Sequence, residues 1–296
     1  MKTMRKGSLF QLSIPENWKN VTIEQILKLR WQAPKKLIHM MRVNKEIKVN
    51  GDYLPWNHPL SPGDLLQIDL FKETDYDVLP SYGELHVLYE DDHLIVVNKP
   101  AGLDTHPNKP GEEGTLANLI AFHFQTMGEN CRVMHIHRLD RDTSGAVVFA
   151  KHPLSKAILD RLLIERKVKR TYLALVHGKF KQKKGTISER IGRDRHHNTR
   201  RRVSTSGQEA VTHYRVLEVR ENMTLTEVVL DTGRTHQIRV HMSHIGHPLA
   251  GDTLYGGKPV FKRQALHAAR ISFPHPLTGE MIEREAECLD DIVLES

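Results

Sequence analysis

The sequence predicts an α+β protein, with a mostly antiparallel mixed sheet preceded by a small α/β unit. Strand-like segments outnumber helical ones and are joined by short turns, which favours antiparallel pairing. At 296 residues the chain is long enough for two domains. An acidic, turn-rich stretch without periodicity runs over 71–83. We therefore expect a first domain at 1–73, a linker at 74–83 and a larger domain at 84–296.

The first domain is predicted to contain two helices, a hairpin turn and a final strand. Thr22 and Gln25 have the spacing of a capping box ahead of an apolar run. Asn50-Gly51 is a dipeptide that favours a tight hairpin turn. In chain order, we expect a helix at 26–30, a helix at 34–41, a strand at 47–49 and a strand at 66–70.

The larger domain is predicted to alternate β-branched strands with two amphipathic helices. Thr115 and Pro153 stand where helices commonly begin. Ile238 and Val240 alternate with polar residues, which indicates a strand with one polar face. The expected strands are 85–89, 94–98, 146–150, 171–176, 210–219, 224–230 and 234–241, with helices at 115–124 and 153–163.

The positive charge of the chain is concentrated in one region. Residues 151–202 hold 17 Lys and Arg against 4 Asp and Glu, a local charge of +13, whereas the remainder carries −6. The most basic part, 179–202, lacks the apolar face that a membrane-surface helix needs. This asymmetry predicts a surface for a polyanion, and nucleic acid is favoured over a membrane.

Other chemistries find little support. Cys131 and Cys288 are far apart without metal or redox spacing, and no apolar run could span a membrane, so a cytoplasmic location is expected. Four histidines between 236 and 247 match no standard metal-ligand spacing. The sequence also lacks a nucleophile elbow, a Walker loop and a dinucleotide fingerprint. No metal and no nucleotide cofactor are expected.

The stretch from His137 to Gly145 carries the densest chemistry in the chain. It places two carboxylates and two guanidiniums within 138–142, just before the buried strand expected at 146–150. Loops fixed by a rigid strand carry function more often than average. The local pattern alone fits a solvated turn with surface ion pairs equally well.

The same stretch resembles the signature of the RluA-type pseudouridine synthases. Further motifs of that family occur in its order across about 84–290, and 1–73 is similar to the S4 RNA-binding domain. The matching segments are Lys169–Gly178, Gly233–His241, Gly251–Gly256, Leu266–Ala268 and Phe273–Pro276. The resemblance implies the pseudouridine synthase fold with a central basic cleft and isomerisation of specific uridines in structured RNA.

The resemblance also implies roles for individual residues. Asp140 is the expected catalytic carboxylate, and whether it attacks C6 of uracil or C1′ of ribose stays open. Tyr172 is expected to line the ring pocket and accept the C5 proton. Arg239 would pair with Asp140, and Arg138 would fill the gap left by a flipped base. Asp142 is expected to orient the turn through neighbouring backbone groups.

The remaining expectations concern RNA contacts and partners. Arg138, Arg141 and His236 are expected to bind RNA, as are the basic residues Arg200, Arg201 and Arg202. Large-subunit ribosomal RNA is favoured as substrate through the S4-like domain, and tRNA stays open. A monomer is the default. Two other functions remain: a non-catalytic RNA-binding or ribosome-assembly factor, and an RNA glycosylase that stops at bond cleavage.

Overall fold

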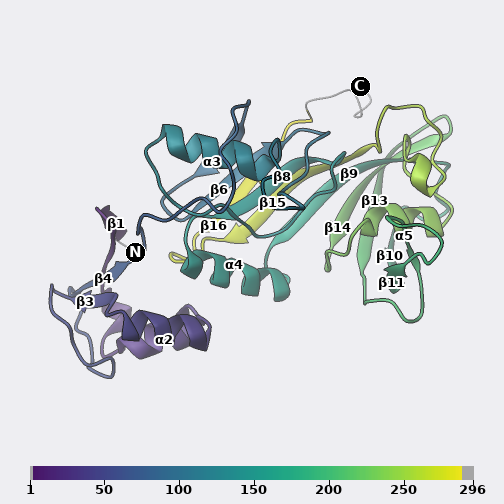
Figure 1. Ribbon diagram of the computed structural model, residues 1–296. Helices are drawn as coiled ribbons and strands as arrows, with labels where there is room; N and C mark the ends of the chain where they lie inside the picture. The colour runs from purple at the N-terminus through teal and green to yellow at the C-terminus, as the bar shows by residue number, and fades with distance from the viewer. Residues whose placement is uncertain (1–2, 289–296) are drawn as a thin grey trace.

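A ten-stranded sheet forms the centre of the larger unit in the computed structural model, which describes residues 3–288 (Figure 1). Eight strands follow the order β10-β13-β14-β9-β15-β8-β6-β5, while β16 pairs with β15 and β7 with β8. Among these described strands, only β8 and β15 pair in parallel. The fold is the α+β architecture that the sequence predicted. The elements of this unit, in chain order, are β5 (His86–Glu90), β6 (Leu94–Lys99), α3 (Leu116–Thr126), β7 (Met134–His135), β8 (Ser144–Ala150), α4 (Pro153–Ile164), β9 (Lys169–His177), β10 (Lys184–Ile187), β11 (Ile191–Arg193), β12 (Arg201–Val203), β13 (Thr212–Arg220), β14 (Met223–Leu230), α5 (Gln237–His244), β15 (Leu266–Pro274) and β16 (Met281–Glu285).

Helices cover both faces of the sheet at β6 and β8. Val96 and Val148 share a core with α4, whereas Ile95 and Val147 share another with α3. Successive residues of a strand point to opposite faces of the sheet. Since helices cover both faces here, every side chain of β6 and β8 is buried. These two strands form the rigid support behind the 137–143 loop.

The N-terminal unit contains a hairpin that the sequence analysis missed. Its four-stranded sheet has the order β1-β2-β4-β3, so the unexpected strands β1 and β2 extend the predicted pair. β1 is exposed throughout and β2 buries three consecutive residues, so neither shows the alternation that marks a half-buried strand. The elements are β1 (Thr3–Lys6), β2 (Leu9–Ser13), α1 (Ile23–Gln25), a wide helical turn Ile26–Arg30, α2 (Lys35–Val43), β3 (Ile47–Val49) and β4 (Leu65–Asp69).

Two local predictions in this unit are confirmed. Gln25 N donates to Thr22 Oγ1 while Thr22 N donates to Gln25 Oε1, which completes the capping box. Asn50 and Gly51 both have positive φ and join Val49 to Asp52 in a two-residue turn. However, β3 pairs with β4 and not across that turn.

The two units share one hydrophobic core. Phe10 and Trp31 of the first unit belong to the same buried cluster as Val96 and Phe273 of the second. The stretch 71–85 forms no helix or strand, as expected of a linker. The boundaries at 73 and 84 stay a prediction, and the last eight residues of the expected domain, 289–296, lie outside the described residues.

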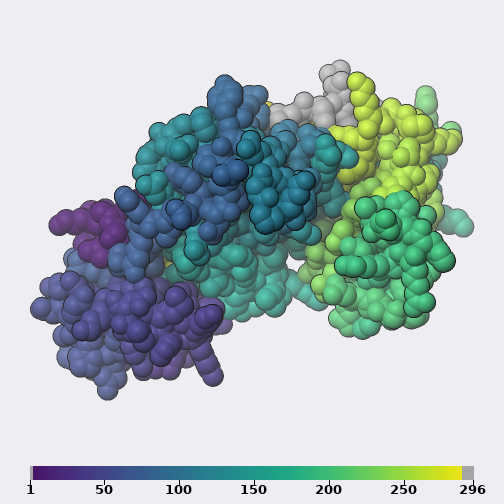
Figure 2. Space-filling model, viewed as in Figure 1, coloured from purple at the N-terminus to yellow at the C-terminus, as the bar shows by residue number. Residues whose placement is uncertain are grey.

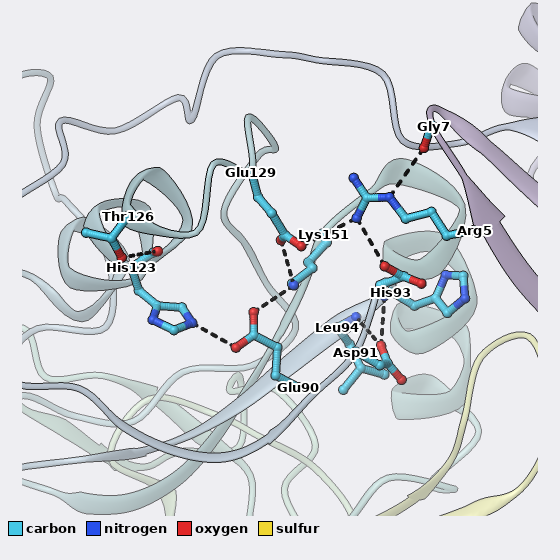
Figure 3. A network of polar contacts seen from close by, with 11 residues as sticks. Arg5, Gly7, Glu90, Asp91, His93, Leu94, His123, Thr126, Glu129 and Lys151 are labelled. Atoms are coloured by element: carbon cyan, nitrogen blue, oxygen red, sulfur yellow. Dashed lines mark hydrogen bonds and ion pairs between the residues drawn. The ribbon is translucent and has the colours of Figure 1, made fainter.

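Polar contacts join the same units at the N-terminal hairpin (Figure 3). Arg5 Nη1 lies 3.0 Å from Asp92 Oδ1 and 3.4 Å from Glu129 Oε1. The Lys151 ammonium bridges Glu129 and Glu90, each at 2.7 Å. This ion-pair chain connects β1 to β5 and to Lys151, which directly follows β8.

The segment expected as a strand at 234–241 is largely helical, and the prediction was wrong. It enters α5 through His236, whose φ of 59° is left-handed. The polar residues that suggested a solvated strand face are buried and bonded: Gln237 donates to Val211 O, and His241 contacts Thr212 and Glu189. Tertiary partners, not solvent, therefore account for the polar pattern.

None of the helices within residues 3–288 has the length and apolar character needed to cross a membrane.

Candidate active site

A cleft of about 1160 Å³ opens beside the start of β8, where the 137–143 loop leads into the strand. The space-filling view is hollowed between the teal and the green parts of the chain (Figure 2). Seven arginines and five carboxylates line it, so the cleft is basic as predicted. The arginines are Arg138, Arg141, Arg166, Arg170, Arg201, Arg234 and Arg239.

Asp140 stands on a turn that main-chain contacts fix. Thr143 N donates to Asp140 O at 3.0 Å and closes the turn. One residue earlier, Leu139 exchanges two hydrogen bonds with the Thr105 hydroxyl. Gly145 follows with φ of 117°, and a Cβ there would lie 2.3 Å from Ala268 O. Only glycine therefore lets β8 approach β15 this closely directly behind the carboxylate.

Two predicted residues approach this carboxylate, and a third lines the same cleft. Arg239 Nη1 donates to Asp140 Oδ2 at 3.2 Å, and His236 Nε2 lies 3.8 Å from the same oxygen. The Asp140 side chain keeps 24% of its surface exposed, so it remains open to a substrate. Tyr172 lines the same cleft from β9 and is 4% exposed.

Burial controls the protonation of the neighbouring groups. Burial raises the pKa of Tyr172, the nearby Arg170 charge opposes this, and Asp140 adds to it, so the phenol is neutral near pH 7. Burial also lowers the pKa of His236, against the opposing charge of Asp140. Although burial disfavours the charge on Arg239, its carboxylate partners raise its pKa, and it stays cationic.

The predicted RNA-binding residues divide into two groups. Arg138, Arg141 and Arg201 line the cleft with His236. Arg200 and Arg202 lie on or beside the β11–β12 hairpin, exposed but outside the cleft lining. Arg138 Nη1 donates to His106 Nε2 at 3.1 Å. Three further arginines that the sequence reasoning did not single out, Arg166, Arg170 and Arg234, also line the cleft.

Asp142 does not hold the turn as expected. Among the described residues, its carboxylate receives no hydrogen bond, and its backbone oxygen accepts one from Arg263 at 3.1 Å. Lys99 takes the structural role instead. This lysine is fully buried, and its ammonium donates to Pro100 O, Leu103 O and Arg141 O at 2.7–3.0 Å.

The clustered histidines serve separate contacts. His236 meets Tyr255, His241 meets Thr212, and His247 meets the backbone oxygen of His177. Within residues 3–288, no three His, Cys, Asp or Glu side chains are grouped as a metal site would require.

Comparisons with known proteins agree across most of the chain. Residues 93–244 match the family model for RNA pseudouridylate synthase, and residues 10–66 match the RluD ribosomal pseudouridine synthase N-terminal domain. The uncharacterized RNA pseudouridine synthase YhcT of Bacillus subtilis is 50% identical, over 95% of this chain and 94% of that protein. The ribosomal large subunit pseudouridine synthase D of Haemophilus influenzae is 43% identical, over 71% and 69%. The solved structure of human RNA pseudouridylate synthase domain containing 1 is similar with a TM-score of 0.58 and 28% identity, covering 72% of this chain and 90% of that one.

Proposed function

Because this chain belongs to the RNA pseudouridylate synthase family and carries the S4-like N-terminal domain of its RluD type, we propose that it converts specific uridines of large-subunit ribosomal RNA to pseudouridine. The relatives named for that substrate support this choice over tRNA. A cytoplasmic, monomeric enzyme acting without metal or nucleotide cofactor is part of the same proposal.

The reaction needs one nucleophile and one proton acceptor. Asp140 forms a transient bond to C6 or C1′, the N1–C1′ bond breaks with its electron pair on uracil, and the ring turns. C5 then bonds to C1′ and loses its proton, while N1 gains one and the carboxylate is released. The atoms balance without any co-reactant. In this scheme Tyr172 lines the ring pocket and accepts the C5 proton.

The observation that carries the proposal is the pairing of Asp140 with Arg239 in an open cleft. The Arg239 guanidinium, 3.2 Å from Oδ2, orients the carboxylate that nucleophilic attack requires. Buried Tyr172 forms part of the apolar lining of that cleft together with Leu230 and Leu266, which suits a planar base removed from its stack.

RNA contacts are proposed around this centre. Arg138, held by His106 at the rim, is placed to occupy the stack that a flipped uridine leaves. Arg141, Arg201 and His236 line the remaining wall and would contact the sugar–phosphate backbone. Arg200 and Arg202 would extend this contact along the exposed hairpin.

The test measures tritium release from ribosomal RNA labelled at C5 of uridine. The Asp140→Asn variant keeps the size of the side chain but cannot act as a nucleophile. We expect turnover to fall below detection because the nucleophile is lost. The Kd for RNA should change less than about threefold, because Asp140 acts in the reaction and not in ground-state binding of the RNA. An active Asp140→Asn enzyme would remove the mechanism.

The same assay separates the other functions. A binding-only factor would release no tritium from any RNA, and a glycosylase would release free uracil. Mapping pseudouridines in total RNA from cells that lack the gene identifies the substrate: missing sites in tRNA alone would replace the ribosomal assignment.

A further inference from the structure

The short turn that follows Gly251 lies behind both partners of Asp140. Asp252 precedes a single 3₁₀ turn, Thr253–Tyr255, and is 2% exposed. Backbone packing fixes this turn: a Cβ on Gly251 would lie 1.9 Å from Arg263 O, and one on Gly257 would lie 2.0 Å from Leu249 O. The turn belongs to the Gly251–Gly256 motif, and its side chains have no role in the reaction proposed for Asp140 and Tyr172.

Asp252 occupies one complete edge of the Arg239 guanidinium. Arg239 Nε donates to Asp252 Oδ2 at 2.7 Å, and Nη2 donates to Asp252 Oδ1 at 2.9 Å. This bidentate pair leaves Nη1 to donate to Asp140 at 3.2 Å. Among the described residues, Arg239 thus contacts Asp140 through Nη1 alone, and not through the two parallel bonds that arginine often makes with a carboxylate.

His236 is the second partner of Asp140, and Tyr255 determines which of its ring nitrogens carries the proton. Arg201 N donates to the Tyr255 hydroxyl oxygen at 2.8 Å, and that oxygen lies 2.8 Å from His236 Nδ1. Since burial raises the pKa of Tyr255, the hydroxyl keeps its proton and donates it to Nδ1. In the neutral His236 ring the remaining proton then sits on Nε2, the atom that faces Asp140.

Both donors thus point at the same oxygen. Arg239 Nη1 and His236 Nε2 lie 3.2 Å and 3.8 Å from Asp140 Oδ2. Across residues 3–288, no side-chain or main-chain group donates to Asp140 Oδ1. The two carboxylate oxygens are therefore unequal: one is held, and the other keeps its lone pairs for a substrate.

We propose that Asp252 and Tyr255 are positioning residues that direct Arg239 and His236 onto Oδ2 of Asp140, which leaves Oδ1 as the attacking atom. The inference rests on the proposed role of Asp140 as nucleophile. It holds for attack at either C6 or C1′, because in both routes Oδ1 supplies the electron pair of the new bond and recovers it on release.

The main variant is Asp252→Asn, with Thr253→Ala as the matched control on the same turn. An amide offers Arg239 one acceptor in place of two, and its NH₂ group opposes a guanidinium that can only donate. We expect kcat to fall about 10- to 100-fold, the loss typical of a charge-assisted hydrogen bond, while KM and RNA affinity stay within about twofold. Thr253 is exposed, and its side chain makes no hydrogen bond among the described residues, so its variant keeps wild-type kcat.

A double-variant cycle tests whether Asp252 acts through Arg239. Arg239→Gln removes the guanidinium, so adding Asp252→Asn to it should cost less than about twofold more in kcat. Independent, multiplicative losses would overturn the proposal. The proposal is also overturned if Asp252→Asn lowers kcat only in proportion to a smaller fraction of folded enzyme. Thermal unfolding of each variant measures that fraction.

Tyr255→Phe supplies a second readout. Without the hydroxyl, His236 can place its proton on either nitrogen, and we expect kcat to fall about 3- to 10-fold with an unchanged Kd for RNA. An unchanged kcat would remove Tyr255 from the proposal. Asp140→Asn, assayed in parallel, separates the two levels: an active Asp140→Asn enzyme defeats the proposed mechanism, whereas an inactive one beside a fully active Asp252→Asn enzyme defeats this inference alone.

Discussion

Lys99 illustrates how a buried charge stabilises the active-site turn at the scale of one residue. Burial lowers the pKa of its ammonium to about 8, yet the group finds three backbone oxygens within hydrogen-bond distance. An ammonium has three donors, so each oxygen is satisfied. One of them belongs to Arg141, directly after Asp140, and the charge therefore fixes the backbone that carries the carboxylate.

Tyr172→Phe is the prediction that separates ring packing from proton transfer. The variant keeps the buried ring and removes only the hydroxyl, so we expect the Kd for RNA to change less than about twofold. If Tyr172 accepts the C5 proton, turnover falls about 100-fold or more, the usual contribution of a general base. Tritium release under single-turnover conditions measures it.

The pH dependence of turnover gives a second test of Tyr172 as the proton acceptor. Because burial raises the pKa of Tyr172, the phenolate fraction near pH 7 is small and grows about tenfold per pH unit. A phenolate base therefore makes the wild-type rate rise with pH across the neutral range, and Tyr172→Phe abolishes that rise. Equal turnover and an equal pH profile in both enzymes would assign the C5 proton to another acceptor.

The residues in and behind the cleft differ in how far the sequence could predict them. Asp140, Tyr172 and Arg239 were found because each lies in a motif that resembles the family. Asp252 was within such a motif, but nothing local indicates that it faces Arg239, 13 positions earlier. This contact exists only in the folded chain, where α5 packs against the 252–255 turn.

At the scale of elements, α5 shows where a pattern of polarity misleads. Gln237, Arg239 and His241 suggested a solvated strand face, because sequence periodicity assumes that polar residues meet water. Each of these side chains is instead buried with a protein partner. By contrast, α3 and α4 bury apolar residues in the usual way, and both helices were predicted within a few residues of their ends.

The arginines of the β11–β12 hairpin are predicted to bind RNA phosphates. Arg201 lines the cleft, while Arg200 and Arg202 are exposed beside it. Replacing all three by Gln should weaken RNA binding and reduce the slope of log K against log salt by up to about 2.7, since each of the three phosphate contacts contributes roughly 0.7–0.9. Fluorescence titration with ribosomal RNA fragments at several salt concentrations measures the slope.

A charge-matched control makes this test specific. Lys181, Lys183 and Lys184 belong to the same basic region, are exposed, and lie outside the cleft lining. Replacing them by Gln changes the net charge by the same three units and should leave the slope nearly unchanged. If the two triple variants behave alike, the hairpin makes no specific contact and the RNA follows another surface.

At the scale of the whole molecule, a shared core joins the N-terminal unit to the larger one. The sequence predicted the boundary from composition, but it could not reveal the contact. Phe10 and Phe71 pack their rings against His93 at 5.3 Å and 5.6 Å, and Trp31 Nε1 donates to Leu277 O at 3.3 Å. These partners are about 20 to 250 residues apart, beyond the reach of any local pattern. The S4-like domain is therefore held in one orientation relative to the cleft.

The histidines at this junction have defined proton positions. Ser155 N donates to His152 Nδ1, so the proton of the neutral His152 ring sits on Nε2 and is donated to His93 Nδ1 at 2.9 Å. His93 must then be unprotonated at Nδ1. Adding a proton there would set two N–H groups against each other in a buried contact.

This arrangement makes docking of the two units sensitive to acid, which is the last prediction. Burial lowers the pKa of His93 to about 4, against an ordinary value of 6.5, with Asp91 opposing the shift. Between these values the unfolded chain binds more protons, so the stability that neutral His93 contributes is complete above about pH 6.5 and is lost as the pH falls toward 4. The loss is on the order of 3 kcal/mol at 1.36 kcal/mol per pKa unit. Thermal unfolding from pH 7.5 to pH 4.5 measures it. His93→Gln, which cannot titrate, should remove a share of this loss on the order of 3 kcal/mol. An equally steep curve would assign the acid sensitivity to the other buried histidines with lowered pKa values, His152, His135 and His137.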